Sequence, residues 1–112
     1  MPMLFSYGTL RDPVVQRATF GRELAGRDDR LPGYIMALVE ITDPDVIAVS
    51  GQTHHPILIE TADPTGSVPG VVFEVTDSEL SAADRYEVDD YRRVLVSLAS
   101  GEWAWVYVGT AP

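Results

Sequence analysis

Blocks of apolar residues of strand length alternate along the chain with polar, turn-rich segments. The apolar blocks are residues 3–7, 34–41, 57–60, 71–76, 91–98 and 103–108. Runs of this length, bounded by Gly, Pro, Asp and Ser, are typical of short strands. The last two flank the turn sequence ASGE and predict a closing hairpin. Residues 22–33 are polar and turn-rich, with room for an edge strand, and 43–56 fit no single pattern.

Two segments carry the signals that begin and end helices. Asp12 followed by Pro13 suits an N-cap and a first helical position, and Gly21 suits a stop, which predicts a helix over 13–20. Thr76 opens the sequence TDSE, a capping box in which Glu79 reaches back to the helix start. The second helix is therefore expected from residue 77 to about 87.

About six strands with two helices inserted between strand groups indicate the α+β class. A length of 112 residues predicts a single domain over residues 1–112. Because the strands are short and the chain closes on a hairpin, we expect a compact mixed sheet that can curl into a barrel.

Composition excludes several classes of function. The chain has no cysteine, which rules out disulfides, zinc–thiolate sites and a cysteine nucleophile. Its net charge is −9 and no basic stripe is present, so we expect no nucleic-acid partner. No apolar run approaches the roughly 20 residues of a membrane span, and the opening MPMLFSYG does not resemble a signal peptide. We therefore expect a cytoplasmic protein that binds no membrane.

The turn after the first strand is the first candidate site. Tyr7, Gly8 and Thr9 lie between a strand end and a helix start at Asp12, and Gly8 can adopt backbone angles closed to other residues. Successive backbone N–H groups in such a turn form a concave site for a carboxylate or an oxyanion. The alternative interpretation is an ordinary strand-to-helix turn in which glycine relieves strain.

Glu87 is the second candidate. On the expected helix it shares a face with Leu80, which should point into the core. A buried carboxylate needs a partner or has a raised pKa suited to proton transfer. The alternative is that the helix ends earlier and the side chain is solvated.

Tyr107 shares a strand face with two tryptophans, which is typical of packing, although its hydroxyl could enter a cavity. The adjacent histidines 54–55 point in different directions and predict no metal site.

Four segments together resemble the γ-glutamylcyclotransferase-like superfamily, which includes the AIG2-like proteins. They are FSYGTLR, LPGYIMALV, VPGVVFEVTDSELSAADRYEVDDYRRVLV and WAWVYVG, which occur in the family's order between residues 4 and 109. The resemblance implies a small mixed β-barrel of six or seven strands with flanking helices and a cavity at one end. It also implies an enzyme that releases 5-oxoproline and a free amine or amino acid from a small γ-glutamyl compound. No metal or cofactor is implied.

The resemblance assigns a role to six residues. The implied catalytic acid/base is Glu87, and the implied substrate-binding residues are Tyr7, Gly8, Thr9, Leu10 and Tyr107. Two alternatives stay open: a related amide hydrolase that uses water, and a non-catalytic module that binds a small metabolite.

Two positions depart from the family pattern. Val88 stands where members commonly have glycine, and Ala83 stands where they tend to have leucine. The first change could re-aim Glu87 and the second could widen the cavity. A salt bridge from Glu87 to Arg92 or Arg93 would favour the binding module. The leaving amine and the oligomeric state are left open.

Overall fold

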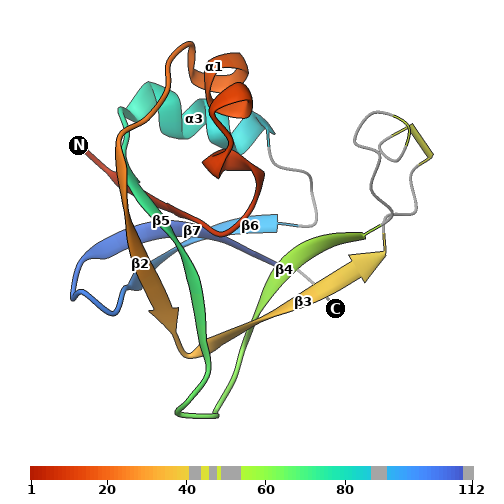
Figure 1. Cartoon of the computed structure of the whole chain (residues 1–112), viewed down its shortest axis with the longest axis vertical. Helices are drawn as coiled ribbons and strands as arrows, with labels where there is room; N and C mark the ends of the chain where they lie inside the picture. The colour runs from red at the N-terminus through yellow and green to blue at the C-terminus, as the bar shows by residue number, and fades with distance from the viewer. Residues whose placement is uncertain (41–43, 46–47, 49–53, 87–90, 110–112) are drawn as a thin grey trace.

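The computed structural model describes residues 1–40, 44–45, 48, 54–86 and 91–109 (Figure 1). Its elements are β1 (Met3–Ser6), the 3₁₀ turn η1 (Thr9–Arg11), α1 (Pro13–Phe20), β2 (Gly26–Pro32), β3 (Tyr34–Glu40), β4 (His54–Glu60), β5 (Ser67–Glu74), α3 (Asp77–Tyr86), β6 (Tyr91–Ser97) and β7 (Trp103–Gly109). The strand-length runs of the sequence thus correspond to strands, and the expected edge strand in residues 22–33 is β2.

The strands form two sheets. The larger has the order β2-β5-β1-β7-β6, and the smaller pairs β3 with β4. Neighbours are antiparallel except β1 and β7, which run parallel, so the larger sheet is mixed. The α+β class and the expected strand number are confirmed. The described strands do not close into the expected barrel, because β2 and β6 are free edges of the larger sheet (Figure 1).

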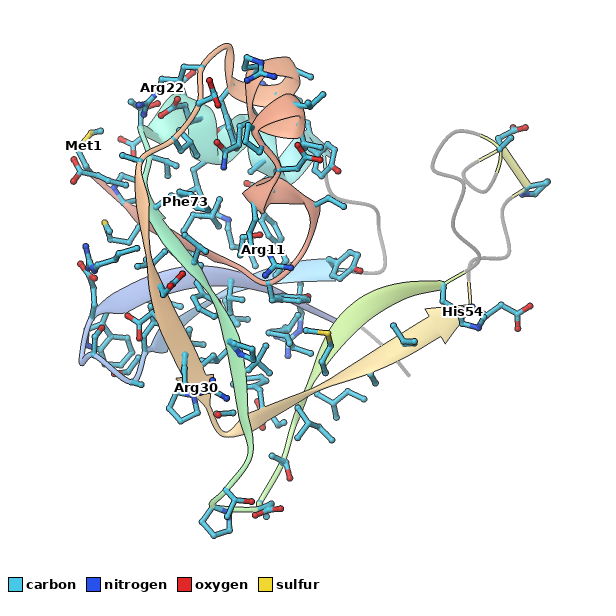
Figure 2. The ribbon with its side chains drawn as sticks, in the orientation of Figure 1. Met1, Arg11, Arg22, Arg30, His54 and Phe73 are labelled. Atoms are coloured by element: carbon cyan, nitrogen blue, oxygen red, sulfur yellow. The ribbon has the colours of Figure 1, made fainter. Side chains whose placement is uncertain are left out.

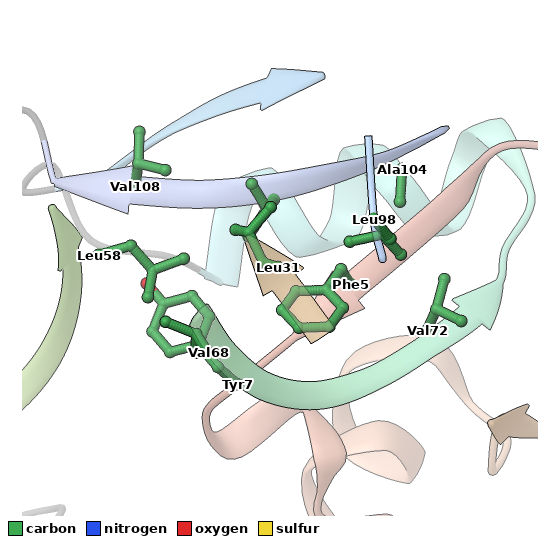
Figure 3. Close-up of a cluster of buried hydrophobic side chains, with 10 residues drawn as sticks. Phe5, Tyr7, Leu31, Leu58, Val68, Val72, Leu98, Ala104 and Val108 are labelled. Atoms are coloured by element: carbon green, nitrogen blue, oxygen red, sulfur yellow. The ribbon is translucent and has the colours of Figure 1, made fainter. Parts of the chain in front are cut away.

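Apolar side chains fill both faces of the larger sheet. One cluster includes Phe5, Tyr7, Leu31, Leu58 and Val108 (Figure 3). Leu58 belongs to β4, so we call this cluster the ribbon-side core, after the two-stranded ribbon of β3 and β4. The other, the helix-side core, packs the sheet against α1 and α3. Its buried members are Leu4, Leu10, Phe73, Val75, Leu80, Ala83 and Tyr107. Successive residues of β1 and β7 therefore belong to different cores, as the alternation of side chains along a strand requires.

The first helix begins and ends where its local chemistry predicts. The Oδ1 atom of Asp12 accepts the backbone N–H of Val14 at 2.8 Å, and Pro13 is the first helical residue. Gly21 ends the helix in the left-handed conformation, with φ of 76°, and its N–H donates to the carbonyl of Arg17. No helix in the described part of the chain combines the length and apolar character that a membrane crossing requires.

The second helix has the expected capping box. The backbone N–H of Glu79 donates to Thr76 Oγ1 at 3.0 Å, and the N–H of Thr76 donates to Glu79 Oε1 at 2.9 Å. Arg22, labelled in Figure 2, donates to both carboxylate oxygens of Glu79, at 2.7 and 2.8 Å. The inward face of α3 carries Leu80, as expected, and also Ala83. The helix is described as far as Tyr86, so its predicted extension to residue 87 lies outside the described residues.

The strongly apolar run 34–41 forms β3 as far as it is described, to Glu40, but the strand is not covered along its whole length. The exposed fraction is 44% for Met36 and 70% for Leu38. The sheet of β3 and β4 extends away from the body of the molecule (Figure 1), and its only described strand pairing is within itself. Side chains near its outer end therefore lack a second layer against which to pack.

The ion pair at the start of α3 makes stability depend on pH. Hydrogen bonding from Arg22 lowers the pKa of Glu79 from 4.5 to about 2. A lowered pKa stabilises the fold above the ordinary pKa and loses that effect as pH falls toward the lowered value. We expect Glu79→Gln to reduce the free energy of unfolding by about 2 kcal/mol at pH 7. The difference from wild type should shrink between pH 4.5 and pH 2, as measured by denaturant unfolding.

The matched control is Glu23→Gln. Glu23 pairs with Arg17, but both side chains are more than half exposed, so its removal should change stability by less than about 1 kcal/mol. A Glu79→Gln effect that stays constant between pH 7 and pH 2 would contradict this account.

Candidate functional site

The turn after β1 begins the candidate site. The chain leaves β1 through Tyr7 and Gly8 and enters η1 at Thr9. The N–H of Arg11 donates to the carbonyl of Gly8 at 3.2 Å, and the N–H of Asp12 donates to that of Thr9 at 2.9 Å. The N–H groups of Thr9 and Leu10 come earlier in the chain than the first of these donors, so they have no acceptor within the turn. We call residues 7–10 the entry loop.

Gly8 keeps one side of the entry loop open. Its φ is −131° and its ψ is −145°, so it does not use the left-handed conformation that would require glycine. A methyl group built at its Cα would meet no atom within 4 Å. The absence of a side chain at Gly8 therefore leaves space beside the backbone, and this is a different reason for glycine than the sequence suggested.

The two ends of the entry loop are anchored in the core. Tyr7 is buried, and its hydroxyl donates to the backbone carbonyl of Tyr107 at 2.7 Å. Leu10 is also buried, and its carbonyl accepts Nε2 of Gln16 at 2.9 Å. The Oε1 atom of Gln16 accepts the backbone N–H of Leu24 at 2.8 Å. Both polar ends of this buried glutamine are thus satisfied, and it ties the loop to the segment after α1.

The middle of the entry loop meets the end of α3. The hydroxyls of Thr9 and Tyr86 are 2.6 Å apart and form a hydrogen bond in which either can be the donor. Tyr86 directly precedes Glu87 in the sequence. Glu87 and Val88 both lie outside the described residues, so the catalytic role of Glu87 and the effect of Val88 stay predictions.

Tyr107 contributes its hydroxyl to a polar cluster beneath the end of α3. The hydroxyl donates to Asp84 Oδ1 at 2.8 Å. Arg93 donates to both oxygens of Asp84, at 2.9 and 3.1 Å. The guanidinium carbon of Arg93 also lies 4.4 Å from the centre of the Trp105 ring. We call Asp84, Arg93 and Tyr107 the clamp.

The clamp was not predicted from the sequence. Asp84 and Arg93 come from a helix and a strand, and Tyr107 is 23 residues from Asp84. Their spacing matches neither the helical nor the strand period, so no local pattern indicates the contact. The sequence suggests Arg93 only as a possible partner of Glu87, whereas the structure pairs it with Asp84.

The entry loop and α3 are joined by two routes. One runs from Tyr7 through the carbonyl and hydroxyl of Tyr107 to Asp84. The other is the direct bond between Thr9 and Tyr86. Asp84 and Tyr86 both belong to the last turn of α3, so the two routes end close together on one element. The structure thus brings together five predicted site residues, which are Tyr7, Gly8, Thr9, Leu10 and Tyr107.

A cavity of about 420 Å³ lies elsewhere, between α1, β2 and β5. Its lining includes Arg11 and Phe73, labelled in Figure 2, but none of Tyr7, Gly8 and Tyr107. The charged side chains around it have both signs, so it offers no clear electrostatic preference for an anion. We therefore do not assign the predicted chemistry to this cavity.

Comparison with known proteins identifies the family. The family model described as gamma-glutamyl cyclotransferase, AIG2-like, matches residues 4–112. The chain therefore belongs to this family, and the resemblance noted from its four motifs is confirmed. A search of curated proteins found no match.

Solved structures share the fold. The solution structure of At3g28950.1 from Arabidopsis thaliana is 25% identical, with a TM-score of 0.75 over 96% of this chain and 61% of that one. A gamma-glutamyl cyclotransferase is 18% identical, with a TM-score of 0.71 over 96% and 66% of the two chains. PH0828 from Pyrococcus horikoshii is 19% identical, with a TM-score of 0.64 over 100% and 80%. The chain thus spans less than two thirds of the length of the first two structures.

The bond between Thr9 and Tyr86 can be tested directly. Thr9→Val keeps the shape of the side chain and removes its hydroxyl, and Tyr86→Phe removes the other partner. We expect each variant to speed hydrogen exchange at the amides of Arg11 and Asp12 by about threefold to tenfold, because one hydrogen bond that holds the turn is lost. The double variant should match the single variants, as measured by NMR.

Thr65→Val is the control, since it removes a hydroxyl bonded to Asp63 in a distant turn. Unchanged exchange at residues 11 and 12 in both single variants would show that this bond does not hold the entry loop.

Proposed function

We propose that this chain is a γ-glutamylcyclotransferase-type enzyme that releases 5-oxoproline and a free amine or amino acid from a γ-glutamyl compound. The observation that carries the proposal is the contact between Thr9 of the entry loop and Tyr86 at the end of α3. These two segments hold the family's two site motifs, Tyr7–Leu10 and the sequence that leads to Glu87. Family membership supports the same reaction class.

The proposed reaction uses a nucleophile within the substrate. The α-amine nitrogen of the γ-glutamyl group attacks the γ-carbonyl carbon, which forms the lactam ring and breaks the bond to the leaving amine. The α-amine loses a proton and the leaving nitrogen gains one, so no water is consumed. Holding the chain folded can supply an effective molarity of about 10⁵ to 10⁸ M. The protein needs only to fix this geometry, move one proton and stabilise the developing charge.

The entry loop suits two parts of this task, which are holding the substrate in a fixed geometry and stabilising the developing charge. The N–H groups of Thr9 and Leu10 are not used by the turn that follows, and Gly8 leaves space beside them. Backbone donors of this kind stabilise an oxyanion by about 10² to 10³-fold each. We assign to these donors either the substrate α-carboxylate or the γ-carbonyl oxygen.

Proton transfer is assigned to Glu87. One carboxylate can take the proton from the α-amine and then deliver it to the leaving nitrogen, which typically contributes about 10² to 10⁴-fold. The resemblance supports this assignment, and the position of Tyr86 beside the entry loop is consistent with it. Arg93 is already bonded to both oxygens of Asp84, so the described contacts give no specific support to the binding-module alternative.

The direct test is product formation. The protein is incubated with γ-glutamyl dipeptides and γ-glutamyl amines, and 5-oxoproline is followed by mass spectrometry. We expect product with at least one substrate, and a loss of about 10²-fold or more with Glu87→Gln, which keeps the shape but cannot carry the proton.

Glu23→Gln, an exposed glutamate on another segment, serves as the control and should retain the wild-type rate. No product from any substrate with folded protein would contradict the proposed reaction. Product at the full rate with Glu87→Gln would show that another group carries the proton.

A further inference from the structure

The carboxylate of Asp84 is held from two different strands. Arg93 of β6 binds both of its oxygens, and Tyr107 of β7 donates a third hydrogen bond to Oδ1. Two parallel bonds between a guanidinium and a carboxylate are stronger and more directional than a single contact. The side chain of Asp84, and with it the end of α3, is therefore fixed in orientation relative to both strands of the closing hairpin.

This clamp differs from an ordinary surface ion pair. Exposed pairs contribute little because water screens them and long side chains lose freedom. Here the side chain of Asp84 is 40% exposed, but that of Arg93 is 25% exposed and its guanidinium stacks on the Trp105 ring. Tyr107 is 6% exposed, so its hydroxyl lies in a site where an unmade hydrogen bond is costly. The three groups are thus held in one arrangement.

The clamp is not required to bury the helix. The apolar contacts of α3 are made by Leu80 and Ala83, which belong to the helix-side core. What the clamp adds is a connection from α3 to the entry loop. Asp84 holds the side chain of Tyr107, and the carbonyl of Tyr107 accepts the hydroxyl of Tyr7 at 2.7 Å.

We propose that Asp84 is a positioning residue, which acts through Tyr107 and Tyr7 to fix the entry loop relative to the last turn of α3. The inference rests on the proposed function, because it concerns the alignment of the two segments assigned to that reaction. Asp84 contacts neither substrate nor a reacting atom in this scheme. Tyr107 then acts through its bonds to Asp84 and Tyr7, whereas the family resemblance implies that it lines the substrate cavity.

The two roles of Tyr107 give different kinetics. If Tyr107 acts through Asp84, removing either partner breaks the same connection, and removing both does no further harm. If Tyr107 contacts substrate independently, the two losses multiply. Misalignment of two otherwise intact segments should lower kcat and leave KM nearly unchanged, since each segment keeps its own contacts with the substrate.

The experiment is a double-mutant cycle with Asp84→Ala and Tyr107→Phe, using the best substrate from the γ-glutamyl panel. We expect each single variant to lower kcat about tenfold, and the double variant to lower it by about the same factor, with KM within about twofold of wild type. Asp84→Asn, which keeps the shape and loses the charge, should show a smaller loss of kcat. It also replaces Asp84→Ala in the cycle if that variant does not fold.

The matched control is Arg22→Ala. It breaks the other bidentate Arg–carboxylate pair of α3, at the opposite end of the helix. We expect it to lower thermal stability without lowering kcat. Losses that multiply to about a hundredfold in the double variant would overturn the inference. So would an effect on KM alone, or an equal loss of kcat in the control.

A second readout keeps this inference separate from the proposed reaction. If wild-type protein forms no 5-oxoproline, the proposed function fails, and hydrogen exchange at the amides of Arg11 and Asp12 then decides whether the clamp holds the loop. Asp84→Ala and Tyr107→Phe should each speed exchange at these two amides, which donate to the carbonyls of Gly8 and Thr9, by about tenfold, while Arg22→Ala should not. Exchange that is unchanged in both clamp variants would overturn the positioning role.

Discussion

The hydrogen bond from the Tyr7 hydroxyl to the carbonyl of Tyr107 is the interaction on which the candidate site depends. A buried tyrosine hydroxyl needs a partner, and this one finds it on β7, the strand that runs parallel to β1. The bond fixes where the chain turns after β1. Because the side chain of Tyr107 binds Asp84, the same residue connects the entry loop to α3. The turn after β1 and the last turn of α3 are therefore coupled through one residue, by its backbone carbonyl and its side-chain hydroxyl.

The helix itself is fixed at both ends by the same kind of contact. Arg22 binds Glu79 at its beginning, and Arg93 binds Asp84 near its end. Each guanidinium forms two hydrogen bonds with its carboxylate, which sets direction as well as distance. Between these two ion pairs, the apolar face of α3 packs on the sheet, but such packing tolerates small rotations of the helix. Two polar contacts at the ends of an apolar face hold the helix to the precision that the proposed reaction requires.

Features that depend on neighbours in sequence could be predicted. The caps of α1 at Asp12 and Gly21 and the capping box at Thr76 and Glu79 follow from residue types a few positions apart. The family motifs also located the entry loop, because they lie within continuous segments. In these cases the physical cause acts within one or two turns of the chain, so the sequence alone carries it.

Features that depend on pairing between distant segments could not be predicted. The bonds from Asp84 to Arg93 and Tyr107 join elements whose contact is set by the order of strands in the sheet. The open larger sheet and the exposure of Leu38 on β3 have the same origin. An apolar run predicts a strand, but the presence of a covering layer is a property of the whole fold.

The most direct test of the central claim is an NMR titration of the ¹⁵N-labelled protein with 5-oxoproline, the proposed product. The account predicts saturable shifts concentrated at the backbone amides of Thr9 and Leu10, which the turn does not use, and at Gly8, which leaves space beside them. Shifts confined to Gln16, Leu24 and Phe73, which line the separate cavity, or no saturable shift at the entry loop, would contradict it.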